Sequence, residues 1–477
     1  MNLKFGTSGL RGLSEELKGM PSALYATAFG RAMMERGMAK AGSRILVGRD
    51  FRDSSPEIAA TAAAALEALG LKPVDCGTLP TPALACRAMA EGVPALMVTG
   101  SHIPADRNGI KFYRPDGEID KADEQSITRL AAGLAGSPAI RVAAPSAFPD
   151  EQAATTDHFM ERNRRILPRG ALAGMTVGVY QHSTVARDMF ADILRHYGAN
   201  VVLLGRSETF IPVDTEAVSP ETLVLLRDWA AATALDAIVS ADGDGDRPLV
   251  TDETGKPLRG DLLGLITASF LGARVVVTPV TSNSGIEKAA AGETIRTRVG
   301  SPYVIEGMAA ALAAGKDRVM GFEANGGLLT ASPFDLAGGR VAALPTRDCF
   351  LPTLAVLHAA RLAGKGLKAF SEAFRLPFAD ADRLENFPVE TSASLMAHLR
   401  AAPANLEAFV APLGTVAAVS DIDGLRVTLG DGSVIHFRPS GNAPEMRCYV
   451  EAEDARAAGT LLHKGLQLIR DYRQLHG

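Results

Sequence analysis

The chain of 477 residues lacks several features that mark particular classes of protein. It has 4 cysteines, which form no CxxC pair and so suggest neither a zinc site nor a disulfide framework. It has no apolar run long enough to span a membrane, and its first residues contain no apolar segment of a signal peptide. The net charge is −5, whereas nucleic-acid-binding proteins usually carry a basic face. We therefore expect a cytoplasmic protein that binds neither nucleic acid nor membrane.

The residues that are present indicate several α/β domains. The length exceeds what one hydrophobic core usually organises, and the composition (47% apolar, 22% charged) is that of a globular protein. Three times, an apolar strand and helix-like sequence precede a second apolar strand that runs into a polar loop. The three pairs of strands lie in 44–50 and 95–102, 175–180 and 236–247, and 273–280 and 317–327. Because ligands bind at the carboxyl ends of parallel strands, the three loops should converge on one cleft.

The last part of the chain has a different pattern. Residues 416–441 contain alternating strands with Asp-Gly turns, which predict an antiparallel sheet, and 455–475 predict an amphipathic helix. The predicted fold class is α/β: three similar domains with mainly parallel sheets, and a C-terminal α+β domain, around a central cleft. The expected boundaries are 1–150, 151–255, 256–368 and 369–477.

The first polar loop carries Ser101 at the end of a predicted strand. Flanking Gly100 and His102 would leave the serine hydroxyl exposed, although an ordinary turn explains the same residues. A Ser/His/Asp hydrolase is a poor alternative. In an extended chain His102 would point away from Ser101, and no GxSxG motif is present.

The second loop places Asp242, Asp244 and Asp246 at alternate positions, with glycines between them. Three carboxylates that face one cation, without His or Cys, suit Mg²⁺ better than zinc. The spacing also resembles an EF-hand, because Glu253 stands at its position 12. Arg247 occupies the position that requires glycine, however, and an apolar strand stands where a helix is needed.

The remaining two loops are weaker signals. Glu323 and Asn325, in GFEANGG, offer an acceptor and an amide for sugar hydroxyls. Arg438, Ser440 and Asn442, with the backbone at Gly441, could form an anion-binding nest. Taken alone, the GFEANGG loop is better explained as a structural turn, and the Arg438 loop is explained equally well as a turn that connects two strands.

Together the loops resemble the motifs of the α-D-phosphohexomutase family, in the family's order and over almost the whole chain. The matching segments are FGTSGLRG (5–12), TGSHIP (99–104), NGIK (108–111), DGDGDR (242–247), GFEANGG (321–327) and RPSGNAPEMRCYVE (438–451). The departures are Gly100 for the usual Ala, Ile103 for Asn, and Asn442-Ala443 for Thr-Glu. The EAN sequence is similar to that of phosphoacetylglucosamine mutases, without their following histidine.

The resemblance implies a mechanism. Ser101 would be phosphorylated, would pass its phosphoryl group to a hexose 1-phosphate, and would recover a phosphoryl group from the hexose 1,6-bisphosphate intermediate, which also acts as activator. Mg²⁺ would be held by a phosphate oxygen on Ser101 and by Asp242, Asp244 and Asp246. A closed cleft would protect the phosphoserine from water.

The resemblance also implies roles for other residues. Arg11 and Arg247 would hold the transferring group. Lys111 and His102 would handle protons, and Lys111 would need a lowered pKa to act as a base. The implied substrate-binding residues are Glu323, Asn325, Arg298, Arg438, Ser440, Gly441, Asn442 and Arg447.

Within the family, the motifs favour the phosphomannomutase/phosphoglucomutase type, acting on small-molecule hexose phosphates as a monomer or weak homodimer. A phosphoglucosamine or phosphoacetylglucosamine mutase is the nearest alternative, because of the EAN sequence. A phosphohydrolase with an aspartyl nucleophile and a non-catalytic sugar-phosphate sensor are alternatives of other classes. The first would need a DxDx[TV] motif after an early strand, and the second is disfavoured by the intact motifs.

Overall fold

The computed structural model describes residues 3–6, 9–137, 140, 142, 147–440 and 444–476. The chain forms two compact units. The first contains Met1–Val276 and Gly300–Ala373, and the second contains Val277–Val299 and Phe374–Gly477. Among the helices that the structure describes, none combines the length and apolarity that a membrane span requires.

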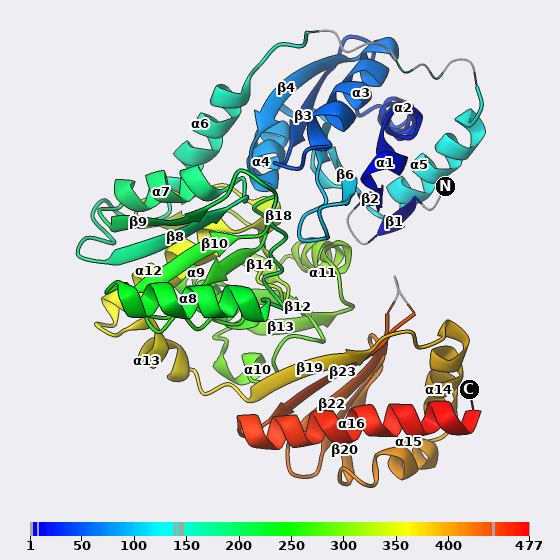
Figure 1. Cartoon of the computed structure of the whole chain (residues 1–477), viewed down its shortest axis with the longest axis vertical. Coiled ribbons are helices and arrows are strands. Elements are labelled where there is room, and N and C mark those ends of the chain that lie inside the picture. Colours follow the sequence, from blue (N-terminus) through cyan, green and yellow to red (C-terminus); the bar gives the residue numbers. More distant parts are fainter. Residues whose placement is uncertain are drawn as a thin grey trace. The chain divides into compact units, whose positions relative to one another are not determined.

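The first sheet has the strand order β1-β2-β6-β5-β3-β4, with β7 paired to β6. Figure 1 labels β1, β2, β3, β4 and β6 of this sheet. Its strands are β1 Lys4–Gly6, β2 Gly9–Leu13, β3 Arg44–Arg49, β4 Lys72–Thr78, β5 Ala95–Val98, β6 Arg107–Arg114 and β7 Gly117–Glu118. The accompanying helices are α1 Ser14–Leu17, α2 Met20–Glu35, α3 Ser55–Ala68, α4 Thr81–Glu91 and α5 Lys121–Leu134. β3 pairs in parallel with β4 and β5, whereas β6 returns antiparallel to β5 directly after the Ser101 loop.

The second sheet has the order β11-β10-β8-β9, in which β8 is parallel to both β9 and β10. Its strands are β8 Thr176–His182, β9 Asn200–Arg206, β10 Ala237–Ala241 and β11 Pro248–Val250, and the helices of this region are α6 Gln152–Asn163, α7 Arg187–His196 and α8 Pro220–Ala232. β11 is antiparallel to β10, so the acidic loop is the tight connection between these two strands.

The third sheet has the order β13-β12-β14-β15-β18, and the division between the two units falls within β12. Its strands are β12 Val275–Pro279, β13 Glu293–Thr297, β14 Val319–Phe322, β15 Leu328–Thr330 and β18 Leu344–Asp348, with a separate hairpin of β16 Phe334–Leu336 and β17 Gly339–Val341. The helices are α9 Gly260–Leu271, α10 Ile286–Ala289, α11 Ser301–Ala313, α12 Phe350–Leu362 and α13 Leu367–Glu372.

The fourth sheet is antiparallel throughout, in the order β19-β23-β22-β21-β20, and α16 packs along it (Figure 1). Its elements are β19 Phe378–Leu384, α14 Val389–Ala401, α15 Pro403–Val410, β20 Val416–Ser420, β21 Leu425–Leu429, β22 Val434–Pro439, β23 Met446–Ala452 and α16 Ala455–His476. Segment 277–299 belongs to this unit. The backbone amide of Ser284 donates to Glu451, and the amide of Val299 donates to Asp423.

The predicted fold class is confirmed, and the apolar strands form where the sequence pattern predicts them. The sheets are mixed more than expected, because β6, β11 and β15 each return antiparallel after a polar loop. A short loop can join only antiparallel neighbours, since a parallel connection needs a long crossover. The first three polar loops therefore lie at the carboxyl ends of β5, β10 and β14, as predicted.

Candidate active site

Ser101 lies two residues beyond β5 in a left-handed backbone conformation, with φ of 54°. This conformation is uncommon for a residue with a Cβ atom, and such residues gather at functional sites. The side chain is 1% exposed. Its hydroxyl donates to Asp242 Oδ2 at 2.5 Å, and its Oγ lies 3.2 Å from His102 Nδ1. The loop geometry therefore directs the Ser101 hydroxyl at the acidic loop.

Arg52 holds the backbone of the Ser101 loop. Its guanidinium donates to four backbone carbonyl oxygens, those of Ser101, Ile103, Pro104 and Arg107, at 2.6 to 3.0 Å. The same guanidinium stacks over the ring of Phe210, 3.9 Å from its centroid. A planar fork with five donors suits this task, because one side chain can satisfy several carbonyls at fixed angles.

The glycine at position 100 follows from this arrangement. A Cβ atom on Gly100 would lie 2.7 Å from Arg52 Cζ, closer than non-bonded carbon atoms approach. The departure from the family's usual alanine is therefore explained by the position of Arg52.

Changing Arg52 to lysine is expected to lower kcat by about 10- to 100-fold with little change in KM, because a small displacement of a reacting group is costly. Lysine has the charge but not the fork, so several buried carbonyls would lose their donor. Steady-state kinetics measure the effect.

Arg187→Lys is the matched control, since Arg187 is also buried but donates to the carbonyls of His182 and Ser207 instead. Equal losses of kcat in both variants would contradict a specific role for Arg52.

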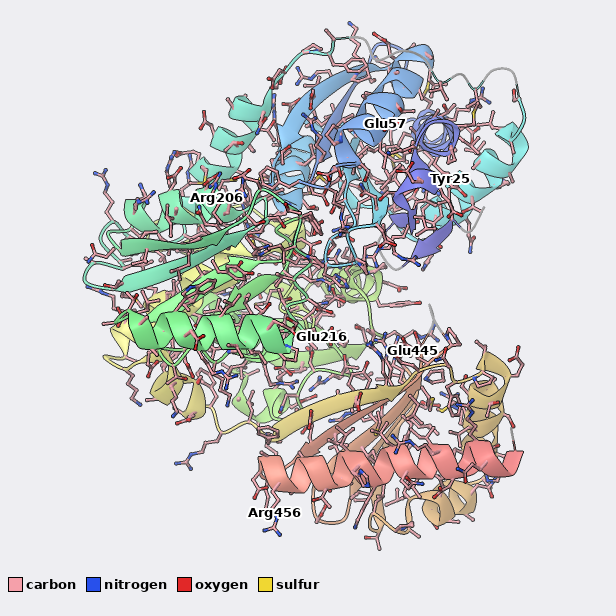
Figure 2. All side chains as sticks on the ribbon, in the orientation of Figure 1. Tyr25, Glu57, Arg206, Glu216, Glu445 and Arg456 are labelled. Atoms are coloured by element: carbon pink, nitrogen blue, oxygen red, sulfur yellow. The ribbon has the colours of Figure 1, made fainter. Side chains whose placement is uncertain are left out.

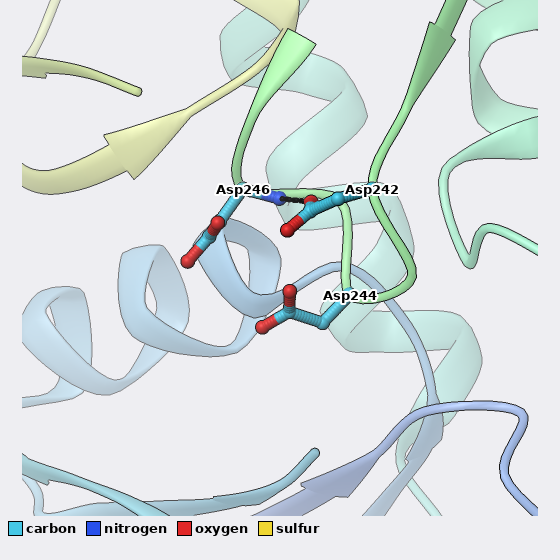
Figure 3. Close-up of side chains that lie close together, drawn as sticks. All are labelled: Asp242, Asp244 and Asp246. Carbon is cyan, nitrogen blue, oxygen red and sulfur yellow. Dashed lines mark hydrogen bonds between the residues drawn. The ribbon is translucent and has the colours of Figure 1, made fainter. Parts of the chain in front are cut away.

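The acidic loop joins β10 to β11 and directs three buried carboxylates toward one another (Figure 3). Asp242, Asp244 and Asp246 each offer an oxygen within 4.8 Å of the others. The amide of Asp246 donates to Asp242 Oδ1 at 3.1 Å and so closes the loop. Gly245 has φ of 67°, a conformation that glycine adopts without strain.

These residues fit a divalent cation bound through oxygen. Within the described residues, Asp244 Oδ1 and Asp246 Oδ1 are buried without a hydrogen-bond partner. Burial and the charges of Asp244 and Asp246 raise the pKa of Asp242 well above its usual value. Three buried carboxylates repel one another unless positive charge lies between or beside them. An all-oxygen set of this kind suits Mg²⁺ or Ca²⁺.

Lys111, on β6, lies against the acidic loop, with Nζ 2.6 Å from both Asp244 Oδ2 and Asp246 Oδ2. Burial lowers the pKa of Lys111, but the two carboxylates outweigh it, and the net shift is upward. The lowered pKa that Lys111 would need to act as a base is therefore not found in this structure. Lys111 is an ammonium group at neutral pH.

Arg11 and Arg247 add positive charge near the acidic loop. Burial, and then the charge of Arg247, lowers the pKa of Arg11 to about 10, so Arg11 stays charged at neutral pH. Arg247 Nη1 lies 3.1 Å from His102 Nδ1. Burial, and then the charge of Arg247, lowers the pKa of His102 to about 3. His102 is therefore a neutral imidazole at neutral pH, and its Nδ1 accepts a hydrogen bond from Arg247 Nη1.

The third loop follows β14, and its Glu323 and Asn325 are buried. The Asn325 side-chain oxygen accepts from the amide of Gly327 at 2.9 Å, so this oxygen builds the loop. Glu323 Oε2 lies 3.3 Å from Arg347 Nη1. A Cβ atom at Gly327 would lie 2.5 Å from Arg347 Cδ, so a side chain at position 327 would require Arg347 to move.

The second unit contains the remaining predicted residues. Arg438 and Arg447 are directly opposite each other on β22 and β23. Like charges at such positions are destabilising unless an anion or carboxylate lies nearby. Arg438 Nε lies 2.9 Å from Asp423 Oδ2, and Arg447 Nη2 lies 3.3 Å from Glu445 Oε2 (Figure 2 labels Glu445).

Ser440 follows β22, and its amide donates to the carbonyl of Glu445 at 2.9 Å. Arg298 is an exposed residue of segment 277–299. The predicted residues Gly441 and Asn442 lie outside the described residues. The first unit thus brings together Ser101, His102, Lys111, Arg11, Arg247, the three aspartates and the third loop, and the second unit carries Arg298, Arg438, Ser440 and Arg447.

The sequence motifs do not contain Arg52, Arg347 or Thr81. The Thr81 hydroxyl donates to Asp244 Oδ2 at 2.7 Å. All three contact the predicted loops from segments outside the motifs. The segment GRDFRD (48–53) directly after a buried strand was a usable signal for Arg52, because charged residues there lie at the same sheet edge as Ser101.

Four family models match successive parts of the chain. They are described as phosphoglucomutase/phosphomannomutase alpha/beta/alpha domain I (residues 2–135), domain II (156–255), domain III (259–376) and the C-terminal domain (384–465). The chain belongs to the phosphoglucomutase/phosphomannomutase family. This confirms the resemblance that the loop motifs carry, and the close relatives of the chain are isomerases that transfer a phosphoryl group.

Similar proteins carry related names. The chain is 56% identical over 470 residues to a phosphomannomutase of Sinorhizobium fredii, which covers 98% of this chain and 99% of the relative. It is 39% identical to a phosphomannomutase of Salmonella muenchen (98% and 96% covered) and 28% identical to a phosphoglucosamine mutase of Thermobifida fusca (99% and 99%).

Solved structures share the fold at low sequence identity. A phosphoglucomutase/phosphomannomutase family protein from Burkholderia thailandensis superposes with a TM-score of 0.75 at 20% identity, covering 98% of this chain and 97% of that one. An N-acetylphosphoglucosamine mutase from Aspergillus fumigatus, solved with GlcNAc-6P and magnesium, gives a TM-score of 0.59 at 15% identity (98% and 96%).

Proposed function

We propose that this chain is a phosphohexomutase that interconverts hexose 1-phosphate and hexose 6-phosphate, with mannose and glucose phosphates as substrates. The observation that carries the proposal is the contact between the Ser101 hydroxyl and Asp242, within a buried triad of carboxylates that Lys111, Arg247 and Arg347 contact. A nucleophilic hydroxyl beside a metal-binding set is the arrangement that phosphoryl transfer requires. The 56% identity to a phosphomannomutase supports the choice of sugar.

In the proposed reaction, phosphorylated Ser101 gives its phosphoryl group to the free hydroxyl of the bound sugar. The Oγ–P bond breaks, a bond from phosphorus to the sugar oxygen forms, and the proton of the sugar hydroxyl passes to Ser101 Oγ, which leaves as a hydroxyl group. The resulting hexose 1,6-bisphosphate turns over and returns its other phosphoryl group to Ser101. We propose that neutral His102, 3.2 Å from Ser101 Oγ, accepts the seryl proton in that return step.

The proposed roles of the cations follow from their protonation. Lys111 carries a proton in this structure, so we propose that it supplies positive charge to the transferring phosphoryl group. Arg11 and Arg247 hold the oxygens of that group, as arginine forks do. Asp242, Asp244 and Asp246, with the phosphate on Ser101, would hold Mg²⁺, which when bound offsets the negative charge that develops at the seryl oxygen.

We propose that the second unit binds the phosphate that is not transferred, through Arg438, Arg447, Ser440, Gly441 and Asn442, with Arg298 as a further cation. The facing arginines on β22 and β23 support this, because guanidinium groups suit the binding of a phosphate dianion. Glu323 and Asn325, in the first unit, would bind sugar hydroxyls.

Arg438→Ala is expected to lower kcat/KM by about 10- to 100-fold, for 1-phosphate and 6-phosphate substrates alike, since a charge-assisted contact contributes about 1.5–3 kcal/mol. The loss should be equal for the two substrates because the sugar must bind in two opposite orientations, with either phosphate held by this unit. Initial rates in the two directions measure it.

Arg456→Ala is the control, because Arg456 is an exposed arginine on α16 of the same unit (Figure 2). An effect of Arg438→Ala confined to one direction would contradict a shared phosphate anchor.

The substrate assignment predicts similar kcat/KM values for mannose and glucose 1-phosphates, within about tenfold, because these sugars differ only at C2 and a small difference in one group gives limited discrimination. Glucosamine and N-acetylglucosamine 1-phosphates are compared under the same conditions. The phosphoglucosamine-type alternative rests on the EAN sequence and on relatives such as the 28% identical enzyme. A large preference for an amino or acetylamino sugar would overturn the proposed substrates, and release of inorganic phosphate without isomerisation would indicate a phosphohydrolase.

We further propose a cytoplasmic enzyme that acts as a monomer or weak homodimer. The four cysteines are free thiols in the structure, three of them buried, which suits a reducing compartment.

A further inference from the structure

Arg347 connects the two loops on which the proposed reaction depends. It lies near the end of β18 with 3% of its surface exposed. Its Nε and Nη2 lie 3.0 and 2.9 Å from Asp246 Oδ2, and its Nη1 lies 3.3 Å from Glu323 Oε2. One guanidinium thus contacts a carboxylate of the acidic loop with one edge and a carboxylate of the GFEANGG loop with another.

The third loop leaves space for the Arg347 side chain because position 327 is a glycine. A Cβ atom at position 327 would lie 2.5 Å from Arg347 Cδ and 2.8 Å from Cγ, so any side chain there would displace the arginine. The residues on either side of the bridge are also held. Thr346 Oγ1 donates to Glu118 Oε1 at 2.8 Å, and Asp348 accepts from Arg162 at 2.9 Å. Strand β18 therefore presents Arg347 from a fixed backbone.

We propose that Arg347 is a positioning residue for sugar recognition, which fixes the Glu323 carboxylate relative to the acidic loop so that the hexose hydroxyls and the transferring group are aligned together. This inference rests on the proposed phosphohexomutase function. Two contacts from one edge of the guanidinium to Asp246 Oδ2 fix its plane, so Nη1 meets Glu323 Oε2 from a fixed direction, which a single flexible ammonium group would not provide. Lys111 cannot substitute for the bridge, because the contacts described for its Nζ are with Asp244 and Asp246.

The inference predicts that Arg347 and Glu323 act as one unit. We expect Arg347→Gln and Glu323→Gln each to raise KM for mannose 1-phosphate and glucose 1-phosphate, and the Kd for glucose 6-phosphate, by about tenfold, since each removes a charge-assisted contact. The double variant should be no more than about twofold worse than the more damaging single variant, because residues in one network are not additive.

Arg187→Gln is the matched control, since Arg187 is also a buried arginine but donates to the carbonyls of His182 and Ser207, outside the bridge. Its effect should multiply with that of Glu323→Gln. Arg347→Lys, which keeps the charge but lacks the fork, should recover part of the lost affinity.

The experiment uses the full-length protein, with steady-state kinetics for both 1-phosphates and calorimetric titration with glucose 6-phosphate. Multiplication of the Arg347→Gln and Glu323→Gln losses, or an unchanged Kd in Arg347→Gln, would overturn the inference. If Arg347→Gln does not fold, the cycle with Arg347→Lys decides by the same criterion. A wild-type protein that converts no hexose phosphate would overturn the proposed function as well, whereas an active wild type with multiplying losses would overturn the positioning role alone.

Discussion

Replacing Ser101 by alanine is expected to lower mutase turnover by about 10⁴-fold or more, because removal of a nucleophile leaves only the contributions of binding and electrostatics. The fold should survive. The Ser101 hydroxyl contacts Asp242 and lies near His102, both in the site, and the loop itself is held by Arg52 through backbone carbonyls. Intact-protein mass spectrometry should show one removable phosphate on the wild type and none on Ser101→Ala.

Ser22→Ala is the control for this prediction. Ser22 is also a buried serine, and it lies in the first turn of α2. Its hydroxyl donates to the carbonyl of Leu17, the last residue of α1. That variant should keep both its phosphate and its turnover. Mutase turnover in Ser101→Ala within tenfold of the wild type would show that another group carries the phosphoryl.

Changing Asp244 to asparagine is expected to weaken metal binding by at least about 10- to 100-fold and to lower kcat by a similar or larger factor. The amide keeps the size of the side chain but removes the charge, and it leaves Lys111 Nζ and Thr81 Oγ1 with a weaker acceptor. Calorimetry with Mg²⁺ and kinetics over a range of Mg²⁺ concentrations measure the two effects. Chelation should stop turnover of the wild type, and Mg²⁺ should restore it.

Asp261→Asn is the matched control, since Asp261 is an equally buried aspartate at the start of α9, paired with Arg259. It should bind Mg²⁺ as the wild type does. Ca²⁺ is expected to bind the wild type but to support little activity, because its looser coordination positions the phosphoryl group poorly. Full activity of the chelated wild type would contradict the metal requirement.

Much of the site was predictable because its reactive residues lie in short sequence motifs at the ends of strands. Asp242, Asp244 and Asp246 follow a buried strand with glycines between them, and that spacing alone brings three carboxylates together. Ser101 also follows a buried strand, in the first sheet, and its hydroxyl contacts Asp242, which follows a strand of the second sheet. In both places the local sequence puts the functional side chain shortly after a buried strand. The carboxyl ends of such strands are where ligands bind.

The remainder could not be predicted, because it depends on side chains that meet only in the folded chain. Arg347 reads as an ordinary residue near the end of a strand, and only the fold shows that it lies between Asp246 and Glu323. The pKa of Lys111 depends on the balance between its burial and two carboxylates more than 130 positions away, and sequence spacing carries no measure of that balance. Gly100 is explained in the same way, by the guanidinium of Arg52 beside it.

The central claim is that the phosphoryl group passes from Ser101 to the sugar and back. The most direct test is a chase of enzyme labelled with radioactive phosphate on Ser101, mixed with excess unlabelled mannose 1-phosphate and sampled over single turnovers. The account predicts that the label appears first in hexose 1,6-bisphosphate and then at C6 of mannose 6-phosphate, as the Ser101 label is replaced. Label that stays on the protein while unlabelled mannose 6-phosphate accumulates, or that leaves only as inorganic phosphate, would contradict it.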